Sequence, residues 1–266
     1  MKQKLSSEFL FQVFALLITV IVVHALYVGV VRPTARAHIE REAALQAAKA
    51  EYIPTRSFAV VIGDYEQEAE VILTIWVLAF MGYKARRVIH EREMLDRHLL
   101  DIPEGTSVLP QDAREYSRAL EALPEKEQDY LLPRTLLAAL QRFATTGNIQ
   151  TVSDTIKENC EIESERLDSE MSMARYVTWA IPSIGFIGTV RGIGDALGQA
   201  YKAMEGDISG VTVSLGVAFN STFVALILSM IIMFCLHQLQ LSQERLVMDC
   251  QRYADRRLLR YLVAPQ

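Results

Sequence analysis

Two apolar segments of the chain carry hydroxyl side chains at helical spacing, and these residues are the ones best suited to chemistry. In residues 176–201, the small residues that recur every three or four positions are Thr178, Pro182, Gly185, Thr189, Gly192 and Ala196. In residues 211–236, the corresponding set is Ala218, Thr222, Ala225 and Ser229. This spacing places each set on one face of a helix. A hydroxyl group there can bind a charged group that crosses an apolar region, or it can bond to the carbonyl four residues earlier, and the residue types favour neither role.

The glycines of the first segment have a simpler interpretation. Small residues let two helices approach closely in lipid, so we expect Gly185, Gly188 and Gly192 to be packing residues. Gly192-x-Gly194-x-x-x-Gly198 superficially resembles a dinucleotide fingerprint, but that motif requires a strand, a turn and a helix in succession. We therefore expect no nucleotide site. Asn220-Ser221-Thr222 matches the glycosylation pattern, yet it falls inside a segment that we expect in the bilayer, where no glycan fits.

Two charges interrupt the first segment. Arg191 and Asp195 are four residues apart, so they can pair on one face of a helix. A charge inside a membrane span costs roughly 2.5–3.5 kcal/mol on insertion scales. Either the two residues form a structural salt bridge near the outer end of the helix, or they mark a polar entry to an ion path, since intramembrane charges often do so.

The lengths of the apolar segments indicate a membrane protein. Residues 9–31 and 211–236 are 23 and 26 residues long without Asp, Glu, Lys or Arg, and residues 176–201 hold only the two charges named above. About 20 apolar residues suffice for a helical span. A fourth span is expected at about 69–83, where 11 unbroken apolar residues are followed by Tyr83 and by the basic residues Lys84, Arg86 and Arg87, as at a membrane interface.

The flanking charges predict the orientation. Lys2 and Lys4 precede the first span, but that span is too long for a signal peptide and no small-residue cleavage site follows it, so we expect a retained anchor. Four spans leave both termini on one side, together with the basic residues that follow the second and fourth spans. The short loop between the last two spans, near 204–210, has no Lys or Arg, which fits the excess of positive charge on the cytoplasmic side. Residues 32–57, on the opposite side, are less consistent because they hold several basic residues.

The rest of the chain predicts an all-α fold with long helices that extend into a cytoplasmic helical domain. The expected parts are an N-terminal membrane region (1–83) with an outer linker that turns at Pro54, a cytoplasmic domain (84–172), a helix hairpin (173–237) and a C-terminal cytoplasmic helix (238–266). Pro133 and Gly147 fit the first position and the stop of one cytoplasmic helix. The apolar stripe from Ile149 to Ala174 predicts a single rod that runs into the third span without a break. A second stripe, from Val247 to Leu262, continues the fourth span as a helix.

Several functional classes are not supported by the residues. Cys160, Cys235 and Cys250 have neither disulfide nor metal-site spacing. The net charge of −5 offers no basic patch for nucleic acid. The five histidines are scattered and no catalytic grouping accompanies them. We therefore expect no enzyme activity, no cofactor, no metal and no nucleic-acid partner.

Residues 182–193, Pro-Ser-Ile-Gly-Phe-Ile-Gly-Thr-Val-Arg-Gly-Ile, resemble the Pro-x-x-Gly-x-x-Gly-Thr-Val-x-Gly-Ile signature of the MotA/TolQ/ExbB family. Residues 215–226 are similar to the final pore helix of that family, and Thr222 falls at the position of its threonine. The clear resemblance covers roughly residues 149–245 and is nearest to TolQ and ExbB. It departs at Val217, where ExbB proteins carry a pore glutamate, and at Arg191, where an apolar residue is usual.

The resemblance implies a proton-conducting subunit of an ion-driven, stator-like motor in a bacterial inner membrane. Such chains form pentamers around a dimer of a single-span partner of the ExbD, TolR or MotB type, whose carboxylate takes up and releases the proton. Thr189 and Thr222 would then be pore residues and Pro182 would bend the third span. Along the same path we include the polar residues Asn220, Ser221 and Ser229.

A different class of function remains open on the sequence alone. The long cytoplasmic helices would also suit a structural membrane scaffold that recruits soluble proteins without conducting ions. The residues do not decide between proton and sodium, nor do they indicate which envelope process is driven.

Overall fold

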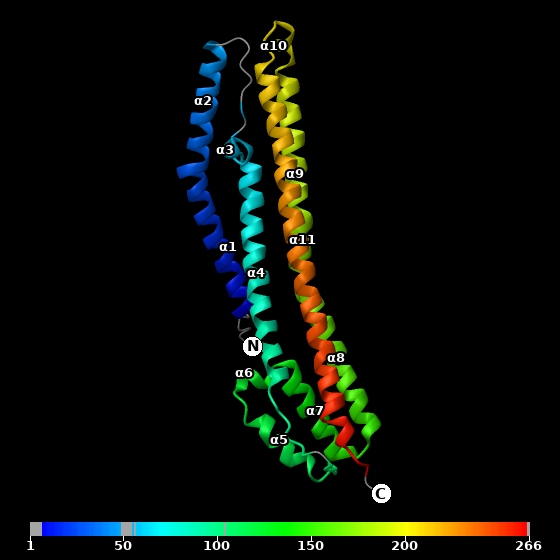
Figure 1. Ribbon diagram of the computed structural model, residues 1–266. Coiled ribbons are helices and arrows are strands. Elements are labelled where there is room, and N and C mark those ends of the chain that lie inside the picture. The colour runs from blue at the N-terminus through cyan, green and yellow to red at the C-terminus, as the bar shows by residue number, and fades with distance from the viewer. Residues whose placement is uncertain (1–6, 49–54, 56, 104, 265–266) are drawn as a thin grey trace, which may run out of the picture. The chain divides into compact units, whose positions relative to one another are not determined.

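The computed structural model describes residues 7–48, 55, 57–103 and 105–264. Helices account for 85% of the structure, and the described residues form no strand. One isolated parallel bridge joins Val108 to Leu262. The predicted all-α fold is therefore confirmed, and its elements are drawn in Figure 1.

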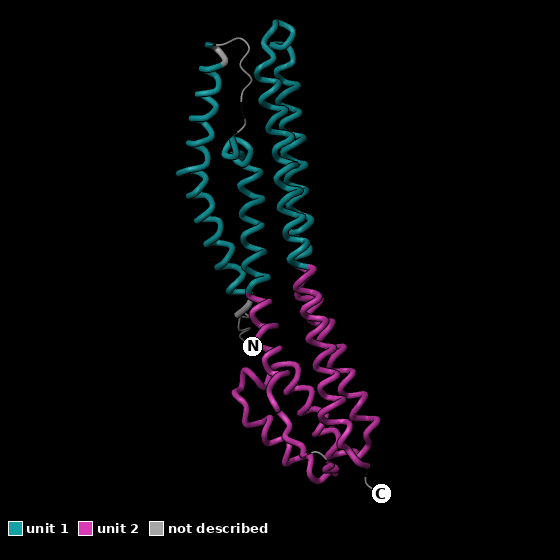
Figure 2. Tube along the Cα trace, viewed as in Figure 1, with its two compact units in different colours: residues 1–82, 173–236 teal, residues 83–172, 237–266 magenta. Residues whose placement is uncertain are grey.

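The chain divides into two compact units, coloured separately in Figure 2. Unit 1 comprises Met1–Gly82 and Met173–Leu236, and unit 2 comprises Tyr83–Ser172 and His237–Gln266. Two long helices, α4 (Tyr65–Asp96) and α11 (Ser209–Arg257), contribute residues to both units. Two helical stretches, Phe9–Leu45 and Ser209–Tyr261, are the ones in the described chain that are long and apolar enough to cross a membrane. The other two expected spans, 69–83 and 176–201, lie within α4 and α9 (Ser172–Gly198) and stay predictions.

Unit 1 begins with three helical segments in direct succession. They are α1 (Ser7–Leu26), the π-helical turn η1 (Tyr27–Val31) and α2 (Arg32–Ala48). Apolar side chains are exposed along most of α1, as expected of a helix that faces lipid. Lys2, Lys4, Lys49, Pro54 and Arg56, which entered the predictions of orientation and of the linker's turn, lie outside the described residues.

The short helix α3 (Phe58–Val61) and the start of α4 pack against this first rod. Ser57 caps α3, since its Oγ accepts a hydrogen bond from the backbone N–H of Ala59 at 3.3 Å. Further along, the Trp76 indole donates to the carbonyl of Gln12 at 3.0 Å. A buried cluster of Val23, Tyr27 and Val31 packs on Ile62, Val71 and Ile72. One face of α4 therefore packs against α1 and η1.

The remainder of unit 1 is a helix hairpin. Its first arm is α9, its second arm is α11, and α10 (Ala200–Met204) lies in the connection, where Gly206 adopts a left-handed φ of 101°. Pro182 lies inside α9. Figure 1 shows the two arms running side by side along α9, and the close contacts of the α9 glycines, given below, fix which faces meet.

Unit 2 is built from α5 (Ala113–Glu121), α6 (Glu125–Gln128), α7 (Leu131–Thr146), α8 (Ile149–Glu170), parts of α4 and α11, and the 3-10 turn η2 (Leu259–Tyr261). Gly147 ends α7 in a left-handed conformation with φ of 59°, which confirms the predicted stop. Asn148 then caps α8, and its side-chain oxygen accepts from the N–H groups of Gln150 and Thr151 at 2.9 and 3.3 Å. Pro133 is the third residue of α7 rather than the first, still within the turn whose N–H groups lack partners.

The predicted unbroken rod from residue 149 into the third span is wrong at one residue. Met171 forms a turn between α8 and α9, and its N–H bonds to the carbonyl of Asp168 at 3.1 Å, a tighter pattern than the α-helical one. The stripe itself is buried from Val152 to Ala174. The spacing of the apolar residues continues across this break in the helical hydrogen bonds. The spacing alone therefore could not show where the helix is interrupted. The second predicted rod is continuous only to Arg257, where α11 ends. The predicted helix beyond that residue is wrong, because Leu258 forms a turn, Leu259–Tyr261 form the 3-10 turn η2 and Leu262 forms the bridge with Val108.

Candidate functional site

The three packing glycines of α9 lie directly against α11. A Cβ atom added to Gly185 would come within 2.5 Å of the Ala225 Cβ, and one added to Gly192 would come within 2.8 Å of the Ala218 Cβ. A Cβ on Gly188 would overlap the Ser221 side chain. Such distances leave no room for a larger residue, so these glycines permit the close approach of the two helices.

This close approach brings Thr189 and Thr222 together. Their hydroxyl groups are hydrogen-bonded to each other across the two helices. The Thr222 hydroxyl also lies 3.1 Å from the Gly185 carbonyl oxygen, and the Thr189 hydroxyl lies 3.1 Å from the carbonyl oxygens of both Gly185 and Ala218. Each hydroxyl has a single proton to donate. The pair can therefore exchange donor and acceptor roles without either oxygen losing all its partners.

The other polar residues placed on the ion path differ in their surroundings. Ser221 is fully buried and its hydroxyl donates to the Gly185 carbonyl at 3.3 Å. Asn220 and Ser229 are also buried. Within the described residues, the Ser229 hydroxyl has no hydrogen-bond partner. Thr178, near the start of α9, instead donates to the carbonyl of Ala174 at 2.8 Å, four residues back.

The two threonines are partly exposed in the single chain, in contrast to Ser221. A hydroxyl group that is both hydrogen-bonded and accessible can turn to donate to an anion or accept from a protonated acid. The geometry thus provides a small polar patch on an apolar hairpin. It contains no acid of its own, because α11 has no Asp or Glu between Ser209 and Leu236.

Arg191 pairs with a residue that the sequence did not suggest. Its guanidinium donates to the Glu66 carboxylate at 2.7 Å, on α4. The pairing with Asp195 that their spacing allows is not the one formed, and Asp195 is exposed. The Cγ of Glu66 also lies 3.1 Å from the Cβ position of Gly188. Since α4 approaches α9 at this level, a carboxylate from another helix is better placed than one on the same helix.

Glu66 is one of several acids at the start of α4. Glu68 is buried between Arg32 and His24, and its carboxylate lies 2.7 Å from the His24 Nδ1. Burial raises the pKa of Asp64, the nearby Arg191 opposes that rise, and Glu66 adds to it. Glu70 is fully buried. The sequence signal for this cluster is the run of alternate acids from Asp64 to Glu70, just before an apolar stretch.

In unit 2, buried charges are paired. Glu163 is 2% exposed and accepts from Arg134 at 2.8 Å and from Arg166. Burial raises the pKa of Glu163, but hydrogen bonds from Arg166 and Arg134 outweigh it, and the pKa falls below its usual value. Lys84 of α4 bonds to Glu170 at 2.7 Å. These contacts join α4, α7 and α8 in one charged network.

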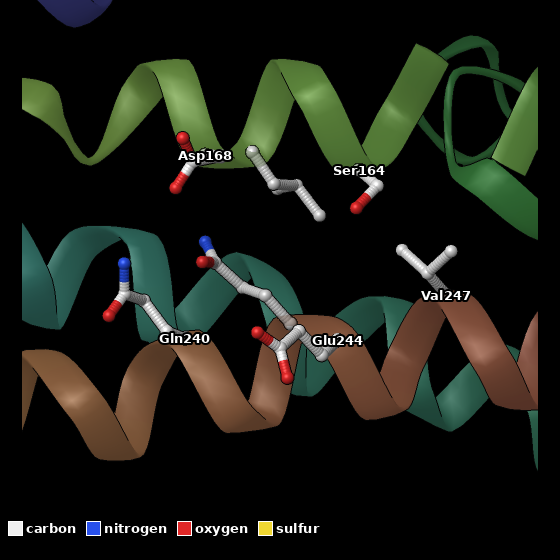
Figure 3. A pocket seen from close by; sticks show the side chains of 7 residues that line it. Ser164, Asp168, Gln240, Glu244 and Val247 are labelled. Atoms are coloured by element: carbon white, nitrogen blue, oxygen red, sulfur yellow. The ribbon is translucent and has the colours of Figure 1, made fainter. Parts of the chain in front are cut away.

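A small groove also lies between α8 and α11 in unit 2. Figure 3 shows Ser164 and Asp168 of α8 facing Gln240 and Glu244 of α11 across it. Leu167 and Val247 line the same groove. No group of three or more potential metal ligands occurs in the part of the chain that the structure describes, and the groove holds no catalytic constellation.

A model of the MotA/TolQ/ExbB proton channel family matches residues 127–252. The matched region contains the threonine pair and the three packing glycines, whereas the acids of α4 precede it. No curated protein and no solved structure matches the chain.

Proposed function

Over residues 127–252 the chain belongs to the MotA/TolQ/ExbB proton channel family, and from this premise we propose that it is the proton-conducting subunit of an ion-driven membrane motor. The observation that carries the proposal is the hydrogen-bonded pair of Thr189 and Thr222 on the close contact of α9 and α11. The motor energises a process at the envelope of a bacterial cell.

The threonine pair lowers the cost of moving a proton through an apolar region. A charged carboxylate in a dry lumen is strongly disfavoured, and hydroxyl groups stabilise it by hydrogen bonds. Neither arm of the hairpin supplies that carboxylate beside the threonines. A single-span partner of the ExbD, TolR or MotB type provides it, and the hydroxyl pair receives the carboxyl group in either protonation state.

The proposed assembly is a pentamer around a dimer of this partner, in the inner membrane. The hairpin α9–α11 faces the centre, because its small faces carry the hydroxyl groups, while α1 faces lipid with its exposed apolar side chains. Four crossings, with parts of α4 and α9 as the second and third spans, leave both termini in the cytoplasm. Mass photometry of the purified chain in mild detergent tests the pentamer, and a monomer would contradict it.

Proton flux into liposomes that contain the chain and its partner tests the proposed path. Thr189→Val and Thr222→Val remove one hydroxyl each and keep the shape of the side chain. The loss of a hydrogen bond to a charged group costs roughly 1.5–3 kcal/mol, which slows a rate-limiting step about tenfold to hundredfold. Thr178→Val is the matched control, since its hydroxyl is already satisfied within α9. Wild-type flux in both pore variants would refute the path.

The scaffold alternative has one observation in its favour. A basic concave surface in unit 2 is lined by Arg92, Arg97, His98, Arg252, Arg256 and Arg257, together with Asp96 and Asp249. Part of this charge is already engaged, since Arg92 and Arg252 lie 3.5 and 3.4 Å from Asp249. The surface suits an acidic cytoplasmic protein. Absence of flux with intact binding of such a protein would favour the scaffold over the channel.

A further inference from the structure

Glu70 in unit 1 is an acidic residue that is buried without a hydrogen-bond partner in the described part of the chain. It is 0% exposed, and neither oxygen of its carboxyl group has a hydrogen-bond partner among the described residues. The residue is at the start of the segment that we expect to be the second span. Ionisable side chains inside membrane segments are costly to keep, and they commonly mark proton or ion pathways.

The position of Glu70 along α4 indicates that its side chain lies on the face of α4 that is turned toward the α9–α11 hairpin. Val71 and Ile72 occupy the face that packs on Tyr27. Glu66, one helical turn before Glu70, occupies the other face, where it pairs with Arg191 and lies beside Gly188. Residues four apart share a helix face. Glu70 is therefore on the face of α4 that meets α9, one turn deeper than the ion pair.

The polar neighbours on this face of α4 do not satisfy the Glu70 carboxyl group. The Thr74 hydroxyl donates to the backbone carbonyl of Glu70 at 2.7 Å, and the Gln67 amide donates to the carbonyl of Val61 at 3.3 Å. Gln67 and Thr74 are buried as well. The Thr74 hydroxyl and one N–H of the Gln67 amide thus donate to backbone oxygens and not to the Glu70 carboxyl group.

The basic side chains that reach this end of α4 are paired with other acids. His24 of α1 and Arg32 of α2 pair with Glu68, and Arg191 of α9 pairs with Glu66. The other described titratable groups near this end of α4, Asp64, Tyr65 and Tyr27, are acids that cannot carry a positive charge. In α11, residues 209–236 contain no Asp, Glu, Lys, Arg or His. Among these described groups, no positive charge is left unpaired to stabilise an ionised Glu70.

We infer that Glu70 is a proton-binding site resident in the chain, and that it exchanges its proton with water through Glu66 at the outer end of α4. A buried carboxylate without a partner is strongly disfavoured relative to the neutral acid. The step is the reversible addition of one proton to one carboxylate oxygen, with no other bond formed or broken. This inference rests on the proposed function only for its role in proton flux, not for the binding of the proton.

Infrared spectroscopy of the purified full-length chain detects the proton directly. The carbonyl stretch of a protonated carboxylic acid should be present at neutral pH in the wild type and absent in Glu70→Gln. Glu66→Gln is the matched control, since that carboxylate pairs with Arg191, and it should retain the band. A band that persists unchanged in Glu70→Gln overturns the site.

A second variant separates proton binding from a merely structural role. Glu70→Leu replaces the neutral acid by an apolar group, so the chain should keep its oligomeric state and its melting temperature. If Glu70→Leu and Glu70→Gln both abolish assembly while the wild type shows no protonated-acid band, the carboxyl group is structural and the inference is wrong.

Flux measurements with the partner test the relay. A positioned proton-transfer group contributes roughly a hundredfold or more to rate, so Glu70→Gln should lower the flux by about that factor. Wild-type flux in Glu70→Gln overturns the relay. If the wild-type complex does not conduct but the band is lost in Glu70→Gln, the proposed channel function fails while the resident proton site stands.

Discussion

Buried charge is treated differently in the two units of this protein. In the described part of unit 2, each charged side chain that is buried has an opposite partner, as with Glu163 between two arginines and Lys84 on Glu170. In unit 1, Glu68 is paired in the same way, but Glu70 is buried without a partner in the described chain. A paired buried charge fixes how helices pack. An unpaired one is tolerated where its protonation is useful.

The hydroxyl groups show the same contrast within unit 1. Thr178 is buried and bonded only to its own helix, whereas Thr189 and Thr222 are partly exposed and bonded to each other across two helices. Unit 1 therefore contains hydroxyl groups that can change their hydrogen bonds, whereas the buried charges described for unit 2 are held in ion pairs.

The largest expected effect is on the stability of unit 2. Glu163→Gln leaves Arg134 and Arg166 without their carboxylate and should lower the free energy of unfolding by about 3 kcal/mol, the lower end for breaking a buried pair. Chemical denaturation measures it. Glu161→Gln, an exposed neighbour on α8, should change stability by less than about 0.5 kcal/mol. If both variants lowered the free energy of unfolding equally, the buried, paired Glu163 would contribute no more to stability than the exposed Glu161.

The pH dependence of that stability has a definite sign. Because the pKa of Glu163 is lower in the folded chain than in the unfolded one, its contribution is present above the unfolded value of 4.5 and is lost as pH falls below it. In Glu163→Gln, the loss of stability below pH 4.5 should be smaller than in the wild type. An unchanged acid profile would show that the arginines do not stabilise the carboxylate.

The next effect concerns the close contact in the hairpin. Gly188→Ala would force a methyl group against Ser221 and Glu66, and overpacking of this kind costs about 1–3 kcal/mol. Gly194→Ala is the matched control, because nothing lies within 4 Å of its Cβ position, and alanine favours the helix by up to about 1 kcal/mol. Thermal unfolding of both variants checks the prediction. A Gly188→Ala chain as stable as Gly194→Ala would mean that the helices do not pack this closely.

The close contact of α9 with α11 could be anticipated from the sequence, because small residues at helical spacing allow close helix packing. The sequence placed Thr189 and Thr222 on those faces, and the structure brings them into contact. Gly147 was predicted for a similar reason, since a left-handed residue at a helix end is nearly always glycine. In both cases the local backbone geometry requires a particular type of residue, so the residue type indicates the geometry.

The sequence did not predict partners that come from distant segments. The apolar stripe of α8 skips from Cys160 to Leu167, and the buried residue between them is Glu163, whose arginine partner Arg134 lies on another helix. Arg191 has an acid four residues away, yet its partner lies 125 residues earlier. A charged residue in a sequence is normally predicted to be exposed to solvent. A buried charged residue can therefore be identified only once its tertiary contacts are known.

The smallest expected effect is that of the Arg191–Glu66 pair. The Arg191 side chain is 43% exposed, and exposed ion pairs contribute about 0.2–1 kcal/mol and weaken with salt. Arg191→Gln and Glu66→Gln should therefore each destabilise the chain by no more than that, and less at high ionic strength. Asp195→Asn should have no effect on the melting temperature. If only Asp195→Asn lowered the melting temperature, Arg191 would pair with Asp195 within α9 and not with Glu66.

The most direct test of the central claim is a double-mutant cycle on proton flux through the chain and its partner in liposomes. If the two hydroxyl groups act as one unit, Thr189→Val and Thr222→Val should each lower the flux about tenfold to hundredfold, and the double variant should conduct about as poorly as either single one. Losses that multiply in the double variant would mean that the threonines act independently. Wild-type flux in all three variants would contradict the account, because the pair would then serve only to pack α9 on α11.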